Sequence, residues 1–298
     1  MKLFKLSILF CLIGTSIGFA QSDFSGERKI NDEFKQYWYD GKAELNSYSL
    51  KQARYGEIHE GTAVLIFVTE PFSTHAHVKS DIPSKENISV LKLNFEKKFN
   101  TGIYPYSMLT SSFVPIEKLS HSLKITSSSQ EWCGHTFMQL NNRQDYDIET
   151  YSYFEKEGDQ RISIAKDFLE DDIWSMIRLN PEDIPTGTYQ LIPSFFYLRL
   201  KHVNLRSYEA VVEKNPIGSG NTMLKVHYPS LNRVLKIEYE STFPYSIVAW
   251  EESYISGWGV SAKMLTTKAK RMKVEKLDYW NKNKIKDLKL RSNMGLGK

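Results

Sequence analysis

The sequence has very little cysteine, and it has no long apolar run after its first twenty residues. Its 298 residues include two cysteines, Cys11 and Cys133. Cys11 lies in the apolar N-terminal stretch, so loss of that stretch would leave Cys133 alone and exclude an intramolecular disulfide. A membrane-spanning helix needs about 20 consecutive apolar residues, and none follows residue 20. Stability must therefore come from burial, for which the 13% aromatic residues supply large apolar surfaces.

Motifs of common hydrolases and nucleotide-binding proteins are also missing beyond residue 20. No Gly-X-Ser-X-Gly and no His-Glu-X-X-His motif occurs there. The segment KNPIGSGN (214–221) lacks the lysine and the helix of a phosphate-binding loop, which predicts a turn between strands. The acidic run FLEDDIW (168–174) lacks the central glycine of a calcium loop and suits the start of a helix. We therefore expect no cofactor.

The first twenty residues have the pattern of a secretory signal peptide. Lys2 and Lys5 precede the apolar stretch LSILFCLIGTSIGF, and GFA places small residues at the −3 and −1 positions before Gln21. Lipoprotein processing at Cys11 is the alternative, but that cysteine lies inside the apolar stretch. We predict that residues 1–20 are cleaved and that the protein is periplasmic or associated with the outer membrane.

Short segments of alternating polarity predict a mainly β protein. We expect curled antiparallel sheets, half-barrel or sandwich-like, with one or two short helices. The predicted strands are 61–70, 87–96, 121–126, 146–154, 160–165, 222–228, 233–240 and 246–254. A helix is expected around 168–179, ended by Pro181. Residues 188–204 are interpreted as a further sheet segment.

A division into parts follows from this pattern. We predict an N-terminal β-rich half (21–165), a helix followed by a β-meander (166–260), and a basic C-terminal segment (261–298). That last segment holds twelve Lys or Arg against three acids, a net charge of +9, whereas residues 21–260 carry −7. It could lie on an anionic surface such as lipid head groups, or it could be a solvated end. Nucleic acid is not an expected partner of an exported protein.

Three groups of residues are candidates for a site. In QEWCGHTF, if residues 130–140 form one strand, Glu131, Cys133 and His135 share a face. They would supply an orienting carboxylate, a nucleophile and a base for a thiol-dependent hydrolase or transferase. The alternative, which the absence of an evident oxyanion donor beyond the Gly134 amide favours, is that Cys133 packs inside the sheet as a small hydrophobe.

The other candidates are aromatic and metal-ligating side chains. The 222–254 meander is rich in aromatic residues, which cover either a core or a ligand, so Tyr239, Tyr245 and Trp250 are candidate ligand-binding residues. His75 and His77 could bind a metal ion together with His59 or Asp81. Their segment has no third ligand at a diagnostic spacing, which favours a solvated loop.

Four segments carry a family resemblance: YWYDGKAELNSYSLKQARYGEIHEGTAVLIFVTEPF (37–72), FNTGIYPYSMLTSSFVP (99–115), QEWCGHTFMQLNN (130–142) and SYFEKEGD (152–159). They resemble an exported family of Bacteroidota with no assigned activity. Such proteins are sometimes labelled septum formation inhibitor Maf. True Maf proteins are cytoplasmic nucleotide pyrophosphatases with a serine-rich phosphate loop followed by arginine near the N-terminus. Here TSSSQEW (126–132) lies mid-chain without that arginine, so we interpret the label as a transfer error.

Together these features predict an exported cell-envelope protein that binds an apolar or amphipathic ligand, or an envelope partner, without catalysis. The rhythm of the C-terminal meander is similar to that of periplasmic half-barrel proteins that hold lipoproteins or lipids. A thiol-dependent enzyme that uses Cys133 and His135 is one alternative. A structural or assembly subunit of an outer-membrane complex is the other, with residues 261–298 docking onto the membrane.

Overall fold

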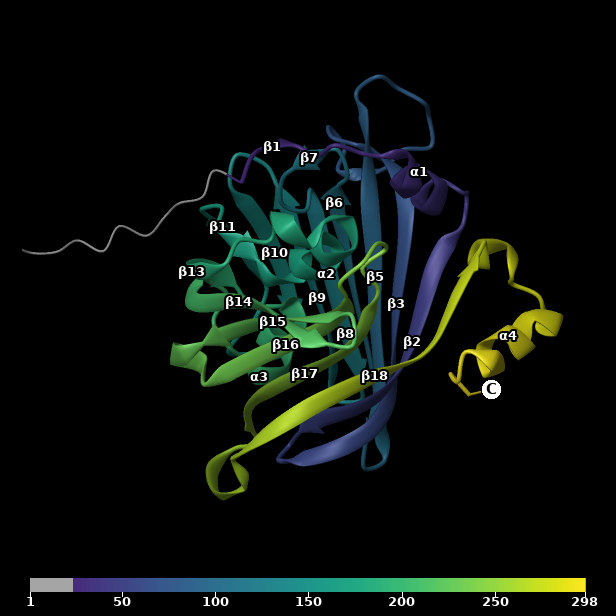
Figure 1. Cartoon of the computed structure of the whole chain (residues 1–298). Coiled ribbons are helices and arrows are strands. Elements are labelled where there is room, and N and C mark those ends of the chain that lie inside the picture. Colours follow the sequence, from purple (N-terminus) through teal and green to yellow (C-terminus); the bar gives the residue numbers. More distant parts are fainter. Residues whose placement is uncertain (1–23, 298) are drawn as a thin grey trace, which may run out of the picture.

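One large sheet dominates the computed structural model, which describes residues 24–297 (Figure 1). The predicted signal peptide, residues 1–20, lies outside the described residues. The large sheet consists of β2 (Ala43–Arg54), β3 (Glu57–Ser73), β4 (Val78–Lys79), β5 (Asn87–Thr101), β6 (Tyr104–Pro115), β8 (Lys124–Glu131), β9 (Gly134–Asn142), β10 (Tyr146–Ser152), β11 (Gln160–Ile164), β12 (Phe168–Leu169), β13 (Gly187–Ile192), β14 (Tyr208–Gly218), β15 (Asn221–Tyr228), β16 (Arg233–Glu240), β17 (Ile247–Ser256) and β18 (Lys263–Leu277). β1 (Gly26–Glu27) and β7 (Lys118–Leu119) form a separate pair.

The strand order is β11-β10-β9-β8-β6-β5-β3-β2-β18-β17-β16-β15-β14-β13-β12, with β4 paired to β3. Neighbours are antiparallel except β12 and β13. The prediction of a mainly β, antiparallel fold is therefore confirmed. The alternation that identified the strands reflects burial, as on β5, where Leu93, Phe95 and Phe99 face inward between partly exposed neighbours.

The sheet curls, because strands far apart in its order contact one another across the core. Phe95 on β5 and Trp250 on β17 have ring centroids 5.3 Å apart. Four strand spacings would place them about 19 Å apart in a flat sheet. Trp174 packs against both, with ring centroids 5.0 Å from Phe95 and 5.3 Å from Trp250. The parts predicted on either side of residue 165 thus share one sheet and one core.

Four α-helices occur in the described part of the chain, where one or two were expected: α1 (Asp32–Trp38), α2 (Glu170–Leu179), α3 (Phe195–Lys201) and α4 (Leu288–Asn293). The helix predicted around 168–179 is confirmed as α2. All ten of its residues are buried, and Figure 1 shows it inside the curl of the sheet. Among residues 24–297, no helix is long and apolar enough to cross a membrane.

The prediction of sheet throughout residues 188–204 is wrong in its second half. β13 ends at Ile192, directly before Pro193, which cannot donate a hydrogen bond to a ladder. The following aromatic run FFYLRL forms α3, whose first six residues are buried. Its apolar character suits burial as a helix as well as burial as a strand, so composition did not separate the two.

Buried ion pairs connect α2 to β2 in one part of the sheet and to β16 in the other. Near its end, Arg178 donates to Glu44 on β2, with 2.7 Å between Nη2 and Oε2. At its start, Glu170 accepts from Arg233 on β16 at 2.5 and 2.6 Å. Asp172 accepts from the backbone N–H of Ser122 at 3.0 Å. The acidic run expected at a helix start is thus present, but the side chains of Glu170, Asp171 and Asp172 are buried and hydrogen-bonded.

The interpretation of residues 261–298 as a solvated end is wrong for its first half. β18 pairs with β17 on one side and with β2 on the other, so it is the strand that joins the two parts of the sheet. Thr267 and Ala269 face inward, whereas Lys268 and Lys270 are exposed. The lysines therefore line the outer face of an internal strand. Residues 278–297, which we call the C-terminal arm, lie beyond it.

Candidate functional site

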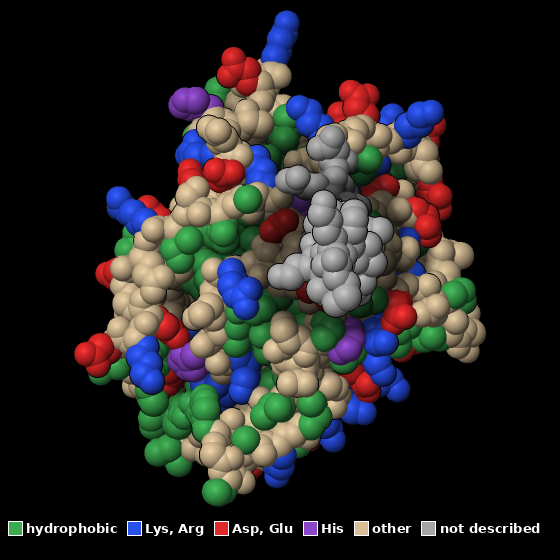
Figure 2. Space-filling view, turned by 90° about the vertical axis from the view of Figure 1, so that its left-hand side faces the viewer, with side chains coloured by type: hydrophobic (Ala, Val, Ile, Leu, Met, Phe, Trp, Pro, Cys, Tyr) green, Lys and Arg blue, Asp and Glu red, His purple; other side chains and the backbone are tan. Residues whose placement is uncertain are grey.

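A cavity of about 740 Å³ opens at one end of the curled sheet. We call this the loop end, because antiparallel pairing brings five connections together there: residues 55–56, 102–103, 132–133, 153–159 and 257–262. Exposed apolar side chains occupy four of these connections: Ile103, Trp132, Tyr153, Trp258 and Val260. Figure 2 shows hydrophobic side chains gathered at the lower edge of the molecule, where these connections lie.

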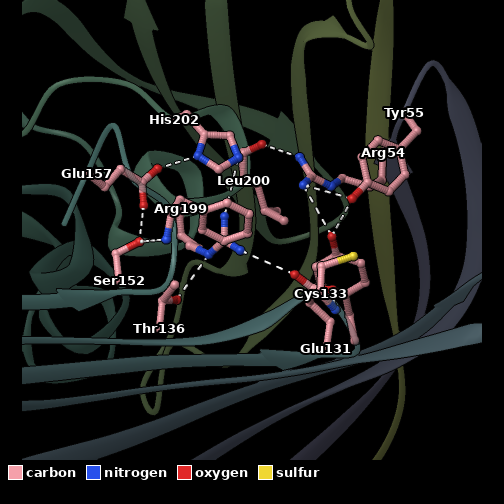
Figure 3. Close-up of polar contacts among 12 residues, drawn as sticks. Arg54, Tyr55, Glu131, Cys133, Thr136, Ser152, Glu157, Arg199, Leu200 and His202 are labelled. Carbon is pink, nitrogen blue, oxygen red and sulfur yellow. Dashed lines mark hydrogen bonds and ion pairs between the residues drawn. The ribbon is translucent and has the colours of Figure 1, made fainter.

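The cavity has an apolar wall and a polar end. Apolar side chains from β9, β11, α3 and the segment after α3 supply the wall: Met138, Ile162, Leu198, Val203 and Leu205. The polar end is formed by Thr136, Ser152, Glu157, Arg199 and His202, which are drawn in Figure 3. A ligand in this cavity would therefore contact both apolar side chains and a charged cluster.

Arg199 is the central cation of this cluster. It is buried, and its Nε donates to Thr136 Oγ1 at 3.0 Å. Its Nη2 lies 3.5 Å from Glu131 Oε1, and its guanidinium lies 4.6 Å from the ring centroid of Phe154. Burial lowers the pKa of Arg199, but an arginine stays charged at neutral pH. The helix α3 therefore ends in a fixed positive charge at the cavity.

His202 extends the cluster from the end of α3. Its backbone adopts the left-handed conformation (φ 52°) as the C-cap of that helix. Its Nε2 lies 3.3 Å from Arg199 Nη1, and its Nδ1 contacts Glu157. The other Glu157 oxygen accepts from Ser152 Oγ at 2.6 Å. Burial alone would raise the pKa of Glu157, but the hydrogen bonds from His202 and Ser152 outweigh it and lower that pKa.

Arg54 lies beside this cluster, at the end of β2. It is buried, and its Nη2 donates to Tyr106 Oη at 3.2 Å and to Tyr55 Oη at 3.3 Å. Its guanidinium also lies 4.2 Å from the Tyr55 ring centroid and 5.4 Å from that of Trp258. None of the carboxylates in residues 24–297 forms an ion pair with Arg54, and its Nε has no hydrogen-bond partner. The loop end thus carries a buried positive charge held by aromatic rings.

Cys133 does not lie in a strand. β8 ends at Glu131 and β9 begins at Gly134, so Trp132 and Cys133 form the turn of a hairpin. The expectation that Cys133 packs inside the sheet is wrong, because the side chain is exposed. The assumption that Glu131, Cys133 and His135 share a face of one strand is also wrong. His135 is exposed on β9, and no hydrogen bond joins it to Cys133 among the described residues.

Glu131 disfavours the reactive thiolate form of Cys133. Its Oε2 accepts from the Cys133 backbone N–H at 2.7 Å, and its other oxygen faces Arg199. The Glu131 carboxylate beside the Cys133 side chain raises the pKa of the thiol. A cysteine nucleophile needs the opposite shift. The geometry therefore does not assemble a nucleophile, a base and an orienting carboxylate here.

A maleimide reagent should label Cys133 in the folded protein without denaturant, because the thiol is exposed. At pH 7 labelling should be slower than in the urea-unfolded chain and faster in a Glu131→Gln variant, since the carboxylate disfavours the thiolate. Mass spectrometry of timed samples measures both rates. Labelling that begins only after unfolding would contradict an exposed Cys133, and an unchanged rate in E131Q would contradict the role of Glu131.

The three aromatic candidates are placed differently. Trp250 lies in the core against Tyr48, with ring centroids 4.7 Å apart. Tyr239 is buried, and burial raises its pKa to about 12. Tyr245 is partly buried with a positive φ of 55°. Tyr239 and Tyr245 line a second cavity of about 420 Å³ beside Lys214, whereas Trp250 lines neither cavity.

The histidines of the metal hypothesis do not form a ligand set. His75 is exposed, whereas His77 is buried with a positive φ of 54°, and burial lowers its pKa. His59 contacts the carbonyl of Arg54 through Nε2 at 3.1 Å, and Asp81 is exposed. In the part of the chain that the structure describes, no three His, Cys, Asp or Glu side chains are grouped for a metal ion. The expectation of a solvated loop fits His75 but is wrong for His77.

Sequence reasoning missed the charged residues of the loop end. Arg54, Arg199, His202 and Glu157 come from three separate segments, and pairing of distant strands brings them together. Because residues 188–204 were interpreted as sheet, the helix that carries Arg199 was not predicted. The one sequence signal was an arginine inside the apolar run FFYLRL, which is unusual for a segment that is otherwise buried.

Comparisons with known proteins add the following. No family model matches the sequence, and no curated protein matches it. The resemblance to an exported Bacteroidota family therefore stays a prediction. Among solved structures, the chain is similar to a β-barrel-like protein of domain of unknown function DUF1849 from Brucella abortus, at 7% identity and a TM-score of 0.42, over 80% of this chain and 98% of that chain. At that TM-score the likeness carries no argument about function.

Proposed function

We propose that this protein is exported to the cell envelope and binds one small amphipathic molecule with an anionic head in the cavity of the loop end, without converting it. The observation that carries this proposal is the cavity itself, with its apolar wall and its buried cation Arg199. Ligand pockets commonly measure about 300–1,000 Å³ and combine apolar walls with a few placed polar groups. A volume of about 740 Å³ falls in that range.

The charges support an anionic head group. Arg199 and the neighbouring Arg54 are both buried, and Glu131 is the acidic partner of Arg199 alone. A carboxylate or phosphate in the cavity would contact the guanidinium of Arg199, which lines it, and arginine can bind such groups in a bidentate way. The alkyl part of the ligand would then lie against Met138, Ile162 and Leu205.

The arrangement supports binding rather than hydrolysis. A serine nucleophile needs a base within hydrogen-bond distance of its hydroxyl. Here Ser152 Oγ donates to Glu157, while His202 Nε2 faces the Arg199 guanidinium at 3.3 Å. The histidine is therefore held by a carboxylate and a cation, and not by the hydroxyl that it would have to deprotonate.

An Ile162→Trp variant tests the proposal by filling the cavity from β11. Titration with the amphipathic anion 8-anilinonaphthalene-1-sulfonate should show at least tenfold weaker binding to this variant than to the wild type, because the indole occupies the ligand volume. Ile217→Trp, at an exposed position on β14, is the matched control and should bind like the wild type. Equal affinity of all three proteins would contradict binding in this cavity.

Native mass spectrometry tests for a natural ligand. Protein recovered from the periplasm should carry an amphipathic anion, which native mass spectrometry detects as an added mass that disappears on organic extraction. The Ile162→Trp protein should be free of that mass. A wild-type protein that is always free of added mass would contradict this proposal.

A further inference from the structure

The C-terminal arm is a surface element that is anchored at both ends. Before it, Lys276 forms an ion pair with Asp40 at 3.0 Å. At its far end, the carbonyl of Met294 accepts from Ser47 Oγ on β2 at 2.6 Å, and the Met294 side chain is buried. Between these anchors lie two short 3₁₀ turns and α4. Figure 1 shows this segment outside the curled sheet, beyond β2.

Between the anchors, the arm exposes apolar side chains. Trp280 is 46% exposed, Leu288 57% and Ile285 87%, whereas Met294 is 4% exposed. The arm is thus held to the sheet by Met294, whereas Trp280, Ile285 and Leu288 are exposed to solvent. Exposed apolar groups that lie close together mark an interaction surface more often than isolated ones do.

The same stretch carries cations without acidic partners. Lys282 forms an ion pair with Asp278 at 2.9 Å, and the Asp287 carboxylate accepts from the backbone N–H of Lys284 at 3.1 Å. Four cations remain on the arm: Lys284, Lys286, Lys289 and Arg291. Within residues 24–297, none of them forms an ion pair with a carboxylate. This charge complements an anionic surface.

We propose that the C-terminal arm binds the surface of an anionic lipid bilayer. Trp280, Ile285 and Leu288 enter the interface, and the four cations lie at the level of the lipid phosphates. Tryptophan is enriched at that level of a membrane, and each Lys or Arg near an anionic surface strengthens binding. A soluble polyanion would contact the cations but would leave the three apolar groups in water. The alternation of both kinds of side chain along the arm therefore favours lipid.

The experiment compares the wild type with three full-length variants by sedimentation with vesicles. The vesicles contain phosphatidylcholine either alone or with 30% phosphatidylglycerol. The charge variant carries Lys284→Gln, Lys286→Gln and Lys289→Gln, and the apolar variant carries Ile285→Ser and Leu288→Ser. The control variant carries Lys79→Gln, Lys85→Gln and Lys118→Gln, three exposed lysines outside the arm that make no ion pair with residues 24–297. Circular dichroism checks that all four proteins are folded.

The wild type and the control variant should bind the anionic vesicles, and 1 M salt should weaken that binding. The charge variant should lose about 100-fold in partition coefficient, and the apolar variant about tenfold or more. Failure of the wild type to bind, or an equal loss in the control variant, would overturn the proposal. Full binding by the apolar variant would also overturn it, because the arm would then recognise polyanions in general. Binding of 8-anilinonaphthalene-1-sulfonate should be unchanged in all three variants, so this test is separate from that of the cavity.

Discussion

Replacing Glu44 with alanine should lower the free energy of unfolding by about 3–5 kcal/mol. Glu44 and Arg178 are both fully buried, and the guanidinium donates to both carboxylate oxygens. Asn46 Nδ2 donates to the same carboxylate at 2.7 Å, and Tyr37 also donates to it. The alanine variant leaves Arg178 charged in the core without its counter-ion. Breaking a buried pair in this way costs far more than the pair itself contributes.

Urea unfolding at pH 7 measures this loss. Glu60→Ala is the control, because Glu60 pairs with Lys51 at 3.5 Å on the exposed face of the same hairpin, where a pair contributes at most about 1 kcal/mol. A double variant, Glu44→Leu with Arg178→Met, should recover most of the loss, since apolar groups can replace a buried pair at little cost. A loss of less than about 1 kcal/mol in E44A would mean that water reaches Arg178.

The same pair predicts an acid-dependent part of the stability. Burial would raise the pKa of Glu44, but the charge and hydrogen bonds of Arg178 outweigh burial and lower that pKa to about 2, from an ordinary value of 4.5. A carboxyl group with a depressed pKa stabilises the fold above its ordinary pKa and loses this contribution as the pH falls. The wild type should therefore lose stability between about pH 4.5 and pH 2 more steeply than E44A.

The strands were predictable where burial alternates along an uninterrupted ladder, as on β5 and β16. Alternation failed at Cys133, because Trp132 and Cys133 continue the polarity pattern of β8 through a turn that contains no Pro, Asn or Asp. The alternation was also missed at β18. Its many lysines suggested a solvated segment, although Thr267 and Ala269 face inward between exposed lysines. In both places local composition resembles one structure while distant pairing partners determine another.

The candidate site was less predictable than the fold. Arg54, Glu157 and Arg199 are separated by up to 145 residues, and each is an ordinary charged residue in its own segment. What makes them a cluster is the closure of the sheet, which places the end of β2 beside the end of α3, where Arg54 donates to the carbonyl of Leu200. No spacing rule within one segment carries that information. Of the residues that stood out in the sequence, Glu131 contacts the cluster through Arg199 at 3.5 Å, whereas Cys133 and the two histidines of the 75–77 segment lie outside it.

The second large effect concerns Asp171, in the first turn of α2. Burial, together with the charges of Glu170 and Asp172, raises the pKa of Asp171 to about 7, from an ordinary value of 3.8. The N–H of Phe195 donates to Asp171 Oδ2 at 3.0 Å, which favours the charged form but does not compensate for burial. Between about pH 3.8 and pH 7, the folded protein therefore holds a proton that the unfolded chain has released.

A carboxyl group with a raised pKa makes stability fall as the pH rises through that window. Asp171→Asn removes the titration and keeps an oxygen that accepts from Phe195. At pH 4 the variant and the wild type should be similar in stability, and at pH 8 the variant should be more stable by on the order of 3–4 kcal/mol, because each pKa unit is worth about 1.4 kcal/mol. Urea unfolding at the two pH values measures this difference.

Asp81→Asn, at an exposed position, is the control and should show no such change with pH. If D171N and the wild type differed by the same amount at pH 4 and pH 8, Asp171 would not hold a proton in the folded state.

The pKa of Lys97, which is buried beside the same group of charges, is lowered by burial. A slope that persists in D171N up to alkaline pH would therefore point to Lys97 as the titrating group. The sign separates the two, because a buried lysine with a depressed pKa makes stability rise with pH, whereas Asp171 makes it fall.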